Sequence, residues 1–317
     1  MDVDVIMPTF TGRREWLIEA IDSVLGQTYP DWRLVVIDDG SPDDKESYVR
    51  ERYGHDERIA VIRLDSNSGP MAAKTAGIEH GTSELIAFLD DDDRWRPEKL
   101  ELQIERLQRT PDVHAVHTDV HYMDAEGRAI PEITDRQNTS RAVIDWDAMD
   151  AREQARSLFS VYPLKHSTSL IVRDAFERVG GYDLSLHDGA DKELWVRFAA
   201  LGNRVAHIPK PLYDRRMHTA NISRTDRLKF IDDKLFTTEK LVSAFPFLHD
   251  LAKARNRRIL RDAVIAGLEE GRGARTRSLV RQLRATGDRG SDLAGAWALS
   301  WLGPLGRSAA RRYVRTR

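Results

Sequence analysis

Four consecutive carboxylates, Asp90, Asp91, Asp92 and Asp93, follow the short apolar run of residues 85–89. The run predicts a buried strand, with the acids just past its carboxyl end. Adjacent anions repel one another, and a hard divalent cation that also binds phosphate oxygens would relieve that repulsion. The pattern therefore favours a Mg²⁺ or Mn²⁺ site for a diphosphate. The alternative is a solvated acidic turn before a helix that starts near Pro97.

The elements that must position these acids follow from the hydrophobic periodicity. Apolar and β-branched runs predict strands over residues 3–7, 32–37, 59–64, 85–89, 113–122, 167–173 and 205–208. Apolar residues at helical spacing predict helices over residues 14–25 and 192–201. Further helices are expected over residues 43–53, 70–80, 98–109 and 174–179. Strands that alternate with helices predict an α/β fold with a single Rossmann-like, mostly parallel sheet flanked by helices.

Ligands of such sheets bind outside the carboxyl ends of the strands. Thr9, Asp38 and Asp39 follow predicted strands at the same edge as the acids. Residues 123–165 give few strong signals, and the pattern from residue 227 onward is helical and basic. We therefore predict a catalytic domain over residues 1–225, with a nucleotide-binding part to about residue 118 and an acceptor part from about residue 119. Residues 226–317 form the predicted helical extension.

The composition limits the chemistry. The chain has 317 residues, of which 41% are hydrophobic and 32% charged, as in ordinary globular proteins with a large core. It has no cysteine, which excludes disulfides, thiolate metal sites and cysteine nucleophiles. No apolar stretch reaches the roughly 18 residues of a membrane span, and the first residues lack the basic start of a signal peptide. A cytoplasmic protein is the expectation.

The charge is unevenly distributed. The net charge is −2, yet residues 251–317 hold 16 basic against 5 acidic residues, a balance of +11 that leaves −13 for residues 1–250. The basic segment has apolar residues at helical spacing and then Trp297, Trp301 and further arginines. It predicts peripheral contact with an anionic membrane surface. The alternative is a packed helical subdomain with solvated arginines. No nucleic acid partner is expected, because no recognition motif accompanies the charge.

Several short segments resemble, in order, those of the inverting family 2 glycosyltransferases, which have the A-type nucleotide-sugar transferase fold. The resemblance spans residues 3–223 and leaves the basic segment uncovered. The matching segments are Ile6-Met7-Pro8-Thr9-Phe10, Gln27-Thr28-Tyr29-Pro30, Val36-Ile37-Asp38-Asp39-Gly40-Ser41, residues 69–78, residues 88–99, Ala190-Asp191-Lys192-Glu193-Leu194-Trp195 and His218-Thr219-Ala220-Asn221-Ile222-Ser223.

The resemblance implies a nucleotide site. Asp39 would accept a hydrogen bond from the imide or amino N–H of a pyrimidine base, with Thr9 nearby on the nucleotide. The alternative for residues 38–41 is a plain turn. Lys74 stands where the family usually has arginine, and it would meet a phosphate or the base as a point charge. The alternative for Lys74 is a solvated helix lysine. Asp90 or Asp91 would lie near the ribose.

The resemblance also implies a metal site. Asp90 and Asp92 fit the Asp-x-Asp signature, and they would hold a Mn²⁺ or Mg²⁺ ion that bridges the two phosphates and neutralises the leaving nucleoside diphosphate. His218 would join the metal or the diphosphate, and an imidazole shifts the preference toward Mn²⁺. The alternative for His218 is an exposed loop histidine.

Asp191 is the candidate general base. Inverting transfer is a single displacement in which the acceptor hydroxyl must lose its proton, and a carboxylate can take it. The alternative role for Asp191 is to cap the helix over residues 192–201. Ala190 and Glu193 replace the Glu and the second Asp that are usual in this segment, which puts the acceptor contacts in doubt more than the base.

These residues favour a metal-dependent transferase that moves a sugar from a nucleoside-diphosphate sugar, most often UDP-linked, to a glycan, a lipid-linked acceptor or a small glycoside. A nucleotidylyltransferase is an alternative, although residues 9–14 make a poor version of its Gly-rich basic loop. A non-catalytic sugar-nucleotide-binding protein is a third reading. The observation that distinguishes this alternative from an enzyme is whether Asp191 faces a bound donor across an open acceptor cleft.

Overall fold

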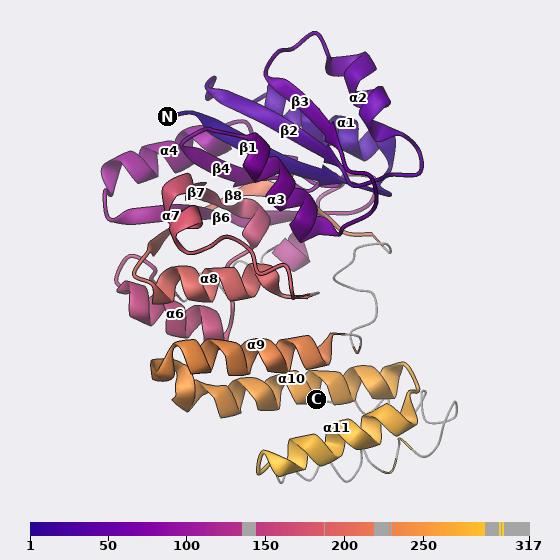
Figure 1. Ribbon diagram of the computed structural model, residues 1–317, viewed down its shortest axis with the longest axis vertical. Helices are drawn as coiled ribbons and strands as arrows, with labels where there is room; N and C mark the ends of the chain where they lie inside the picture. Colours follow the sequence, from indigo (N-terminus) through magenta and orange to yellow (C-terminus); the bar gives the residue numbers. More distant parts are fainter. Residues whose placement is uncertain are drawn as a thin grey trace. The chain divides into compact units, whose positions relative to one another are not determined.

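The computed structural model describes residues 1–134, 144–186, 188–218, 228, 230–288, 298 and 300 (Figure 1). The chain divides into two compact units. The first comprises Met1–Leu184 and Ala190–His218, and the second comprises Ser185–Gly189 and Thr219–Arg317. The first contains the β-sheet, whereas the named elements of the second are helices.

One eight-stranded sheet forms the centre of the first unit. The strands are β1 (Val3–Thr9), β2 (Trp32–Asp38), β3 (Ile59–Arg63), β4 (Leu85–Phe88), β5 (Arg94–Trp95), β6 (Val113–Met123), β7 (Leu170–Val172) and β8 (Arg204–Arg216). They lie in the order β3-β2-β1-β4-β7-β6-β8-β5. The first four in this order are parallel, β6 and β8 are parallel, and β7 and β5 run antiparallel to their neighbours. The predicted α/β class is confirmed.

Helices connect the strands and cover both faces of the sheet (Figure 1). They are α1 (Arg14–Leu25), α2 (Lys45–Tyr53), α3 (Pro70–His80), α4 (Lys99–Arg109), α6 (Ala151–Ser160), the 3₁₀ helix η1 (His166–Thr168), α7 (Arg173–Arg178) and α8 (Ala190–Ala200). Helices α6 and α8 pack against each other. Apolar side chains of α1 and α4 join one buried cluster with alternate residues of the central strands.

Alternation along β1 divides the core between the two faces. Val5 and Met7 belong to the cluster covered by α1 and α4, whereas Ile6 points to the opposite face. There Ile6 and Ile37 contact α3 at Gly77. A β-carbon at Gly77 would lie 2.5 Å from Ile37 Cδ1 and 2.9 Å from Ile6 Cγ2. Glycine therefore allows α3 to approach the sheet closely.

Strand β8 is longer than the strand predicted at residues 205–208. It continues through two prolines because its pairing with β6 is irregular: Ile208 pairs with Thr118, and Pro211 pairs with the next residue, Asp119. Such an irregularity accommodates residues that lack a backbone N–H. The additional length brings the end of β8 to the acidic segment.

Other local predictions also need correction. The strand predicted over residues 167–173 is confined to β7, because η1 occupies its start. Helix α8 begins at Ala190, two residues before the predicted start. Helix α6 lies in the region that gave few sequence signals, and a capping box formed by Asp150 and Glu153 begins it. The two-residue strand β5 was also missed.

The second unit is built on α9 (Ile231–Ala244), the 3₁₀ helix η3 (Pro246–Leu248), α10 (His249–Glu269) and α11 (Gly273–Ala285). Helix α10 packs against α9 and α11 (Figure 1). Their buried side chains form a separate apolar cluster that includes Leu260, Val264, Leu279 and Leu283. Trp297 and residues 301–317 lie outside the described residues. In the part of the chain that is described, no helix is both long and apolar enough to cross a membrane.

A buried ion pair connects β1 to α7. The Arg173 guanidinium lies 2.7 Å from Asp4 Oδ2, and the Asp4 side chain is only 1% exposed. The Ser83 N–H and hydroxyl also donate to the Asp4 carboxylate, both at 2.8 Å. Arg173 further donates to the carbonyl oxygens of Ser83 and Ile78. Three segments that are distant in sequence therefore meet at one desolvated charge.

We predict that Arg173→Met lowers the free energy of unfolding by about 3 kcal/mol, because it leaves the Asp4 carboxylate buried without its cation. Urea titration followed by circular dichroism measures this change. The control is Arg178→Met on the same helix, which removes the exposed pair with Asp174 and should cost less than about 1 kcal/mol. Equal losses in the two variants would contradict the assignment of Asp4–Arg173 as a stabilising pair.

Candidate active site

The four acids directly follow β4 at the carboxyl edge of the parallel strands. The Leu89 N–H donates to the Ile6 carbonyl oxygen at 3.2 Å, so β4 still pairs with β1 as the acids begin. Strand β1 ends at Thr9, which pairs with Asp38 of β2. Because these strands are parallel, their ends meet at one edge of the sheet, where ligands of such sheets bind.

Asp39 is a buried acid just past β2. Its carboxylate accepts the backbone N–H groups of Ser68 at 2.8 Å and Gly69 at 3.0 Å. Burial raises the pKa of Asp39, while these two hydrogen bonds oppose the rise. Each carboxylate oxygen can accept more than one hydrogen bond, so Asp39 can still accept a hydrogen bond from an N–H group of a bound base.

Asp91 faces the end of β1. Thr9 Oγ1 donates to Asp91 Oδ2 at 2.5 Å. Burial raises the pKa of Asp91 to about 7, the hydrogen bond from Thr9 opposes the rise, and the charges of Asp92 and Asp90 add to it. A β-carbon at Gly12 would lie 2.7 Å from the same Asp91 oxygen. Glycine at this position leaves room for the Asp91 carboxylate.

Asp90 is held by two partners. Lys74 Nζ donates to Oδ1 at 2.9 Å, and Ser167 Oγ donates to Oδ2 at 2.6 Å. Burial opposes ionisation of Asp90, but the Lys74 charge and the two hydrogen bonds outweigh it and lower the pKa to about 2. The Lys74 side chain is only 5% exposed, so it is a buried cation facing the acids rather than a solvated helix lysine.

Asp92 and His218 form a second pair. Asp92 Oδ2 lies 2.8 Å from His218 Nε2. The His218 ring packs against Trp16, with ring centroids 4.6 Å apart. Burial raises the pKa of Asp92, the Asp90 charge adds to the rise, and the hydrogen bond with His218 opposes it. The structure thus brings together two of the metal ligands predicted from sequence. Residues 219–223 of the same sequence segment lie outside the described residues.

Asp93 turns inward to the end of β8. Its carboxylate accepts the Tyr213 hydroxyl at 2.6 Å and the Arg216 N–H at 2.7 Å. The Arg216 guanidinium also donates to the Asp92 carbonyl oxygen at 2.9 Å and to Glu19 at 2.6 Å. Burial, with the charge of Asp92, raises the pKa of Asp93 well above its usual range. Asp93 therefore anchors the segment that carries Asp92.

The donor set tests the fit of a metal ion. Among the described residues, no three acidic or imidazole side chains converge on one point. Nucleotide-bound Mg²⁺ needs only one or two protein ligands, since phosphates and water complete its coordination. Asp92 and His218 fit such an ion of Mg²⁺ or Mn²⁺. Asp90 is engaged by Lys74 and Ser167, and its role as a metal ligand stays a prediction.

Asp191 is the second residue of α8, within the first turn rather than at the cap. The Tyr162 hydroxyl donates to Asp191 Oδ2 at 3.1 Å. The pKa of Tyr182 is affected by charges from both ends of the site. Burial raises this pKa well above the usual range, and the charges of Asp191 and Asp90 add to the rise. Asp191 and the acidic segment therefore act on a common region of the first unit.

His166, a buried histidine, contacts both α8 and Tyr182. The Trp195 indole N–H donates to His166 Nδ1 at 3.1 Å, and His166 Nε2 lies 2.6 Å from the Tyr182 hydroxyl. Burial lowers the pKa of His166 well below its usual range, with the Lys74 charge adding to the effect. A neutral ring that accepts at Nδ1 carries its proton on Nε2, so Nε2 donates to Tyr182. His166 therefore connects α8 to η1, which carries Ser167.

Sequence reasoning missed several of these residues. Ser167 and His166 lie in a segment that was read as a strand or left unassigned, and Tyr162 lies in the region with few signals. Arg216 lies beyond the predicted end of the last strand. The apolar pair Leu212 and Tyr213 after Pro211 was the available signal that the strand continues. The contacts of Ser167 with Asp90 and of Arg216 with Asp93 join residues more than 70 positions apart in sequence.

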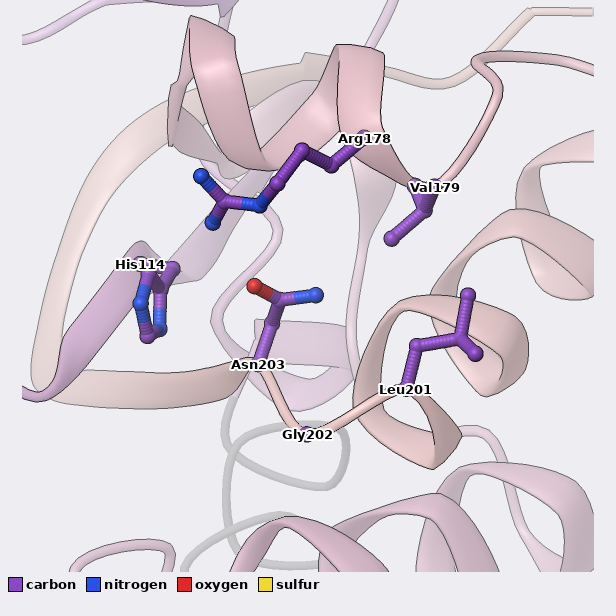
Figure 2. Close-up of a pocket in the computed structure, with 6 residues that line it drawn as sticks. All are labelled: His114, Arg178, Val179, Leu201, Gly202 and Asn203. Carbon is purple, nitrogen blue, oxygen red and sulfur yellow. The ribbon is translucent and has the colours of Figure 1, made fainter.

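A separate pocket of about 430 Å³ lies at the start of β6. Figure 2 shows its lining residues, His114, Arg178, Val179, Leu201, Gly202 and Asn203. Strands β4 and β6 run in the same direction, so the start of β6 lies at the sheet edge opposite the acids. None of these six residues is a carboxylate, and none is among the site residues predicted from the sequence.

Comparisons with known proteins identify the family. The family model described as glycosyl transferase family 2 matches residues 4–180, more than half of the chain. TuaG of Bacillus subtilis (strain 168), named as a candidate glycosyltransferase of teichuronic acid biosynthesis, is 37% identical over 103 residues, which are 32% of this chain and 40% of TuaG. The uncharacterized glycosyltransferase RP339 of Rickettsia prowazekii (strain Madrid E) is 27% identical over 79% of this chain and 78% of its own length. Several curated relatives are thus matched over less than half of their length.

Solved structures share the fold. S. aureus TarS (residues 1–349), solved with UDP-GlcNAc, aligns with a TM-score of 0.62 at 15% identity over 98% of this chain and 92% of that chain. The mannosyltransferase PcManGT of Pyrobaculum calidifontis, solved with GDP-Man and Mn²⁺, aligns with a TM-score of 0.61 at 18% identity over 98% and 84%. The sheet, its acidic edge and the family match agree: this chain belongs to glycosyl transferase family 2.

Proposed function

We propose that the protein is an inverting, metal-dependent glycosyltransferase that moves a sugar from a UDP-sugar to a hydroxyl group of a glycan, a lipid-linked acceptor or a small glycoside. The observation that carries the proposal is the convergence of three groups in one unit. These are the buried base-binding candidate Asp39, the acidic segment with its partners Lys74 and His218, and Asp191 at the start of α8.

The donor would lie along the carboxyl edge of the sheet. Asp39 would accept a hydrogen bond from the imide N–H of uracil, and Thr9 with Asp91 would line the path from the base to the ribose. The Lys74 ammonium, held at Asp90, provides a fixed positive charge toward the ribose and diphosphate. TarS with UDP-GlcNAc and PcManGT with GDP-Man share the fold, and they support a nucleoside-diphosphate sugar as the donor class.

Asp92 and His218 would hold Mn²⁺ or Mg²⁺, with Asp90 as the further candidate ligand, and the ion would neutralise the charge of the leaving nucleoside diphosphate. Several carboxylates lie close together at this place, and their mutual repulsion favours a bound cation. Burial and neighbouring charges raise the pKa of both Asp91 and Asp92, which means that a further positive charge would be favourable here.

Asp191 would act as the general base. The acceptor oxygen attacks the anomeric carbon while its proton passes to the Asp191 carboxylate. The bond from the anomeric carbon to the diphosphate breaks on the opposite face, and its electron pair leaves with the nucleoside diphosphate. The configuration at the anomeric carbon is therefore inverted. Asp191 lies in the first turn of α8, where the helix dipole favours a negative charge.

The acceptor is proposed to be part of a cell-envelope polysaccharide or its lipid-linked precursor. The name of TuaG, which is matched over 103 residues, supports this class. The basic second unit supports a peripheral position on an anionic membrane. Helix α11 buries Leu279, Val280 and Leu283 in the apolar cluster and leaves Arg281 and Arg284 exposed, so contact with a membrane would be through charge.

We predict that Asp92→Ala abolishes the Mn²⁺-dependent part of donor binding while the fold stays intact. A ligand that binds only the folded protein raises the melting temperature. The measurement is a thermal-shift panel with UDP-GlcNAc, other UDP-sugars, GDP-Man and dTDP-glucose, each with and without Mn²⁺. Asp31→Ala, an exposed acid before β2, is the matched control and should behave as wild type. A Mn²⁺-dependent shift that survives Asp92→Ala would refute the metal assignment.

We predict that Asp191→Asn lowers transfer turnover by about 10²–10⁴-fold and leaves donor affinity nearly unchanged, because the amide keeps the shape but cannot take a proton. Turnover is measured with the donor identified in the thermal-shift panel, and donor affinity by calorimetry. A collapse of donor affinity would assign Asp191 to the nucleotide site. Unchanged turnover would require another acid as the base, with Glu193 the first to test.

We predict that changing Arg258, Arg281 and Arg284 together to Gln weakens binding to vesicles with anionic lipid by about 10²-fold, at about 1 kcal/mol per arginine near the surface. Sedimentation with liposomes measures the binding, which should also fall with salt. The control changes Arg33, Arg52 and Arg109, three exposed arginines of the first unit, to Gln. Equal binding by the two triple variants would contradict a membrane role for the second unit.

A further inference from the structure

We infer that Tyr162 is a positioning residue for Asp191: its hydroxyl fixes one carboxylate oxygen so that the other is presented to the acceptor. This inference rests on the proposed role of Asp191 as the base. The direct observation is the hydrogen bond from the Tyr162 hydroxyl to Asp191 Oδ2 at 3.1 Å. Within the described part of the chain, it is the one hydrogen bond to the Asp191 carboxylate.

The backbone of Tyr162 adopts a conformation that disfavours an aromatic residue. Its φ is +45°, in the left-handed region where a β-carbon is crowded by the backbone. Among the described residues, Asp44 is the one other non-glycine residue with positive φ, and Asp44 is a short polar residue that caps α2. An aromatic side chain held in this region indicates that the surrounding structure imposes the conformation.

The surroundings of Tyr162 explain how the conformation is imposed. Helix α6 ends at Ser160 and packs against α8. Gln154 of α6 is buried, and its amide donates to the Trp146 and Val205 carbonyl oxygens while accepting the Val205 N–H. The first turn of α6 is thereby fixed relative to β8. The chain must then turn sharply after α6, and the turn directs Tyr162 to the first turn of α8.

The contacts of the Tyr162 side chain fix its position and keep its hydroxyl protonated. The Lys192 ammonium lies 5.4 Å from the centre of its ring, which adds a cation–π contact to the hydrogen bond with the preceding residue, Asp191. Burial raises the pKa of Tyr162 well above its usual range, and the charge of Asp191 adds to the rise. The phenol therefore remains a proton donor under ordinary conditions.

The consequence concerns the orientation of the base. An aspartate side chain turns about two single bonds, and a hydrogen bond to one oxygen removes most of that freedom. With Oδ2 engaged, Oδ1 becomes the acceptor for the proton of the incoming hydroxyl. Proton transfer requires this oxygen within hydrogen-bonding distance of the acceptor hydroxyl, so losing the orientation slows transfer without changing the donor site.

The test is Tyr162→Phe, which removes the hydroxyl and keeps the ring over Lys192. We expect transfer kcat to fall about 10-fold, in line with the loss of a hydrogen bond to a charged group. The KM for the donor and the melting temperature should stay near wild type. The matched control is Tyr53→Phe, which removes a hydroxyl bonded to Asp22 at 2.8 Å away from the site and should leave kcat unchanged. An unchanged kcat for Tyr162→Phe, or a rise in donor KM alone, would overturn the inference.

A double-mutant cycle with Asp191→Asn separates this inference from the proposed function. If Tyr162 acts through Asp191, adding Tyr162→Phe to Asp191→Asn should cause little further loss, because residues that act as a unit are non-additive. A further 10-fold loss in the double variant would refute action through Asp191. If Asp191→Asn alone leaves turnover unchanged, the proposed base is wrong and the inference falls with it. If Asp191→Asn lowers turnover strongly and Tyr162→Phe leaves turnover unchanged, the proposed base stands and only the inference about Tyr162 fails.

Discussion

Repulsion among four adjacent carboxylates is the constraint around which the first unit is arranged. Each acid has a different partner: Asp90 has Lys74 and Ser167, Asp91 has Thr9, Asp92 has His218, and Asp93 has Tyr213 and the Arg216 N–H. The partners come from β1, α3, η1, β8 and the residues just after β8. No single local segment could neutralise such a run, so the acids are tolerated only in a fold that brings these elements to one edge.

Much of the fold could be predicted from hydrophobic periodicity, because the central strands are short apolar runs and helices α1 and α4 are amphipathic. The exceptions have physical causes. Strand β8 contains two prolines, and its irregular pairing with β6 cannot be read from local sequence. Helix α6 is mostly polar outside Ala155, Leu158 and Phe159, so its capping box was the stronger signal. Strand β5 exists only because two residues meet β8.

The candidate site divides in the same way. Residues that follow strands, such as Asp39 and Asp92, could be found from their spacing and from the family resemblance. Thr9, Lys74 and His218 could be found in the same way. Ser167, His166 and Arg216 could not, because they have no pattern that distinguishes them from ordinary surface or core residues. Their significance arises only when the sheet brings them to the acids, as the bond between Arg216 and the Asp92 carbonyl oxygen illustrates.

The left-handed backbone at Tyr162 has a consequence for how this protein would respond to selection for heat resistance. An aromatic residue in that region costs about 1–2 kcal/mol relative to glycine, which adopts it freely. A screen that rewards only thermal survival would therefore favour glycine or asparagine at this position. Such a screen would discard the phenol that contacts Asp191, so a gain in stability would remove the hydrogen bond to that carboxylate. Laboratory evolution of this chain needs activity in the selection from the first round.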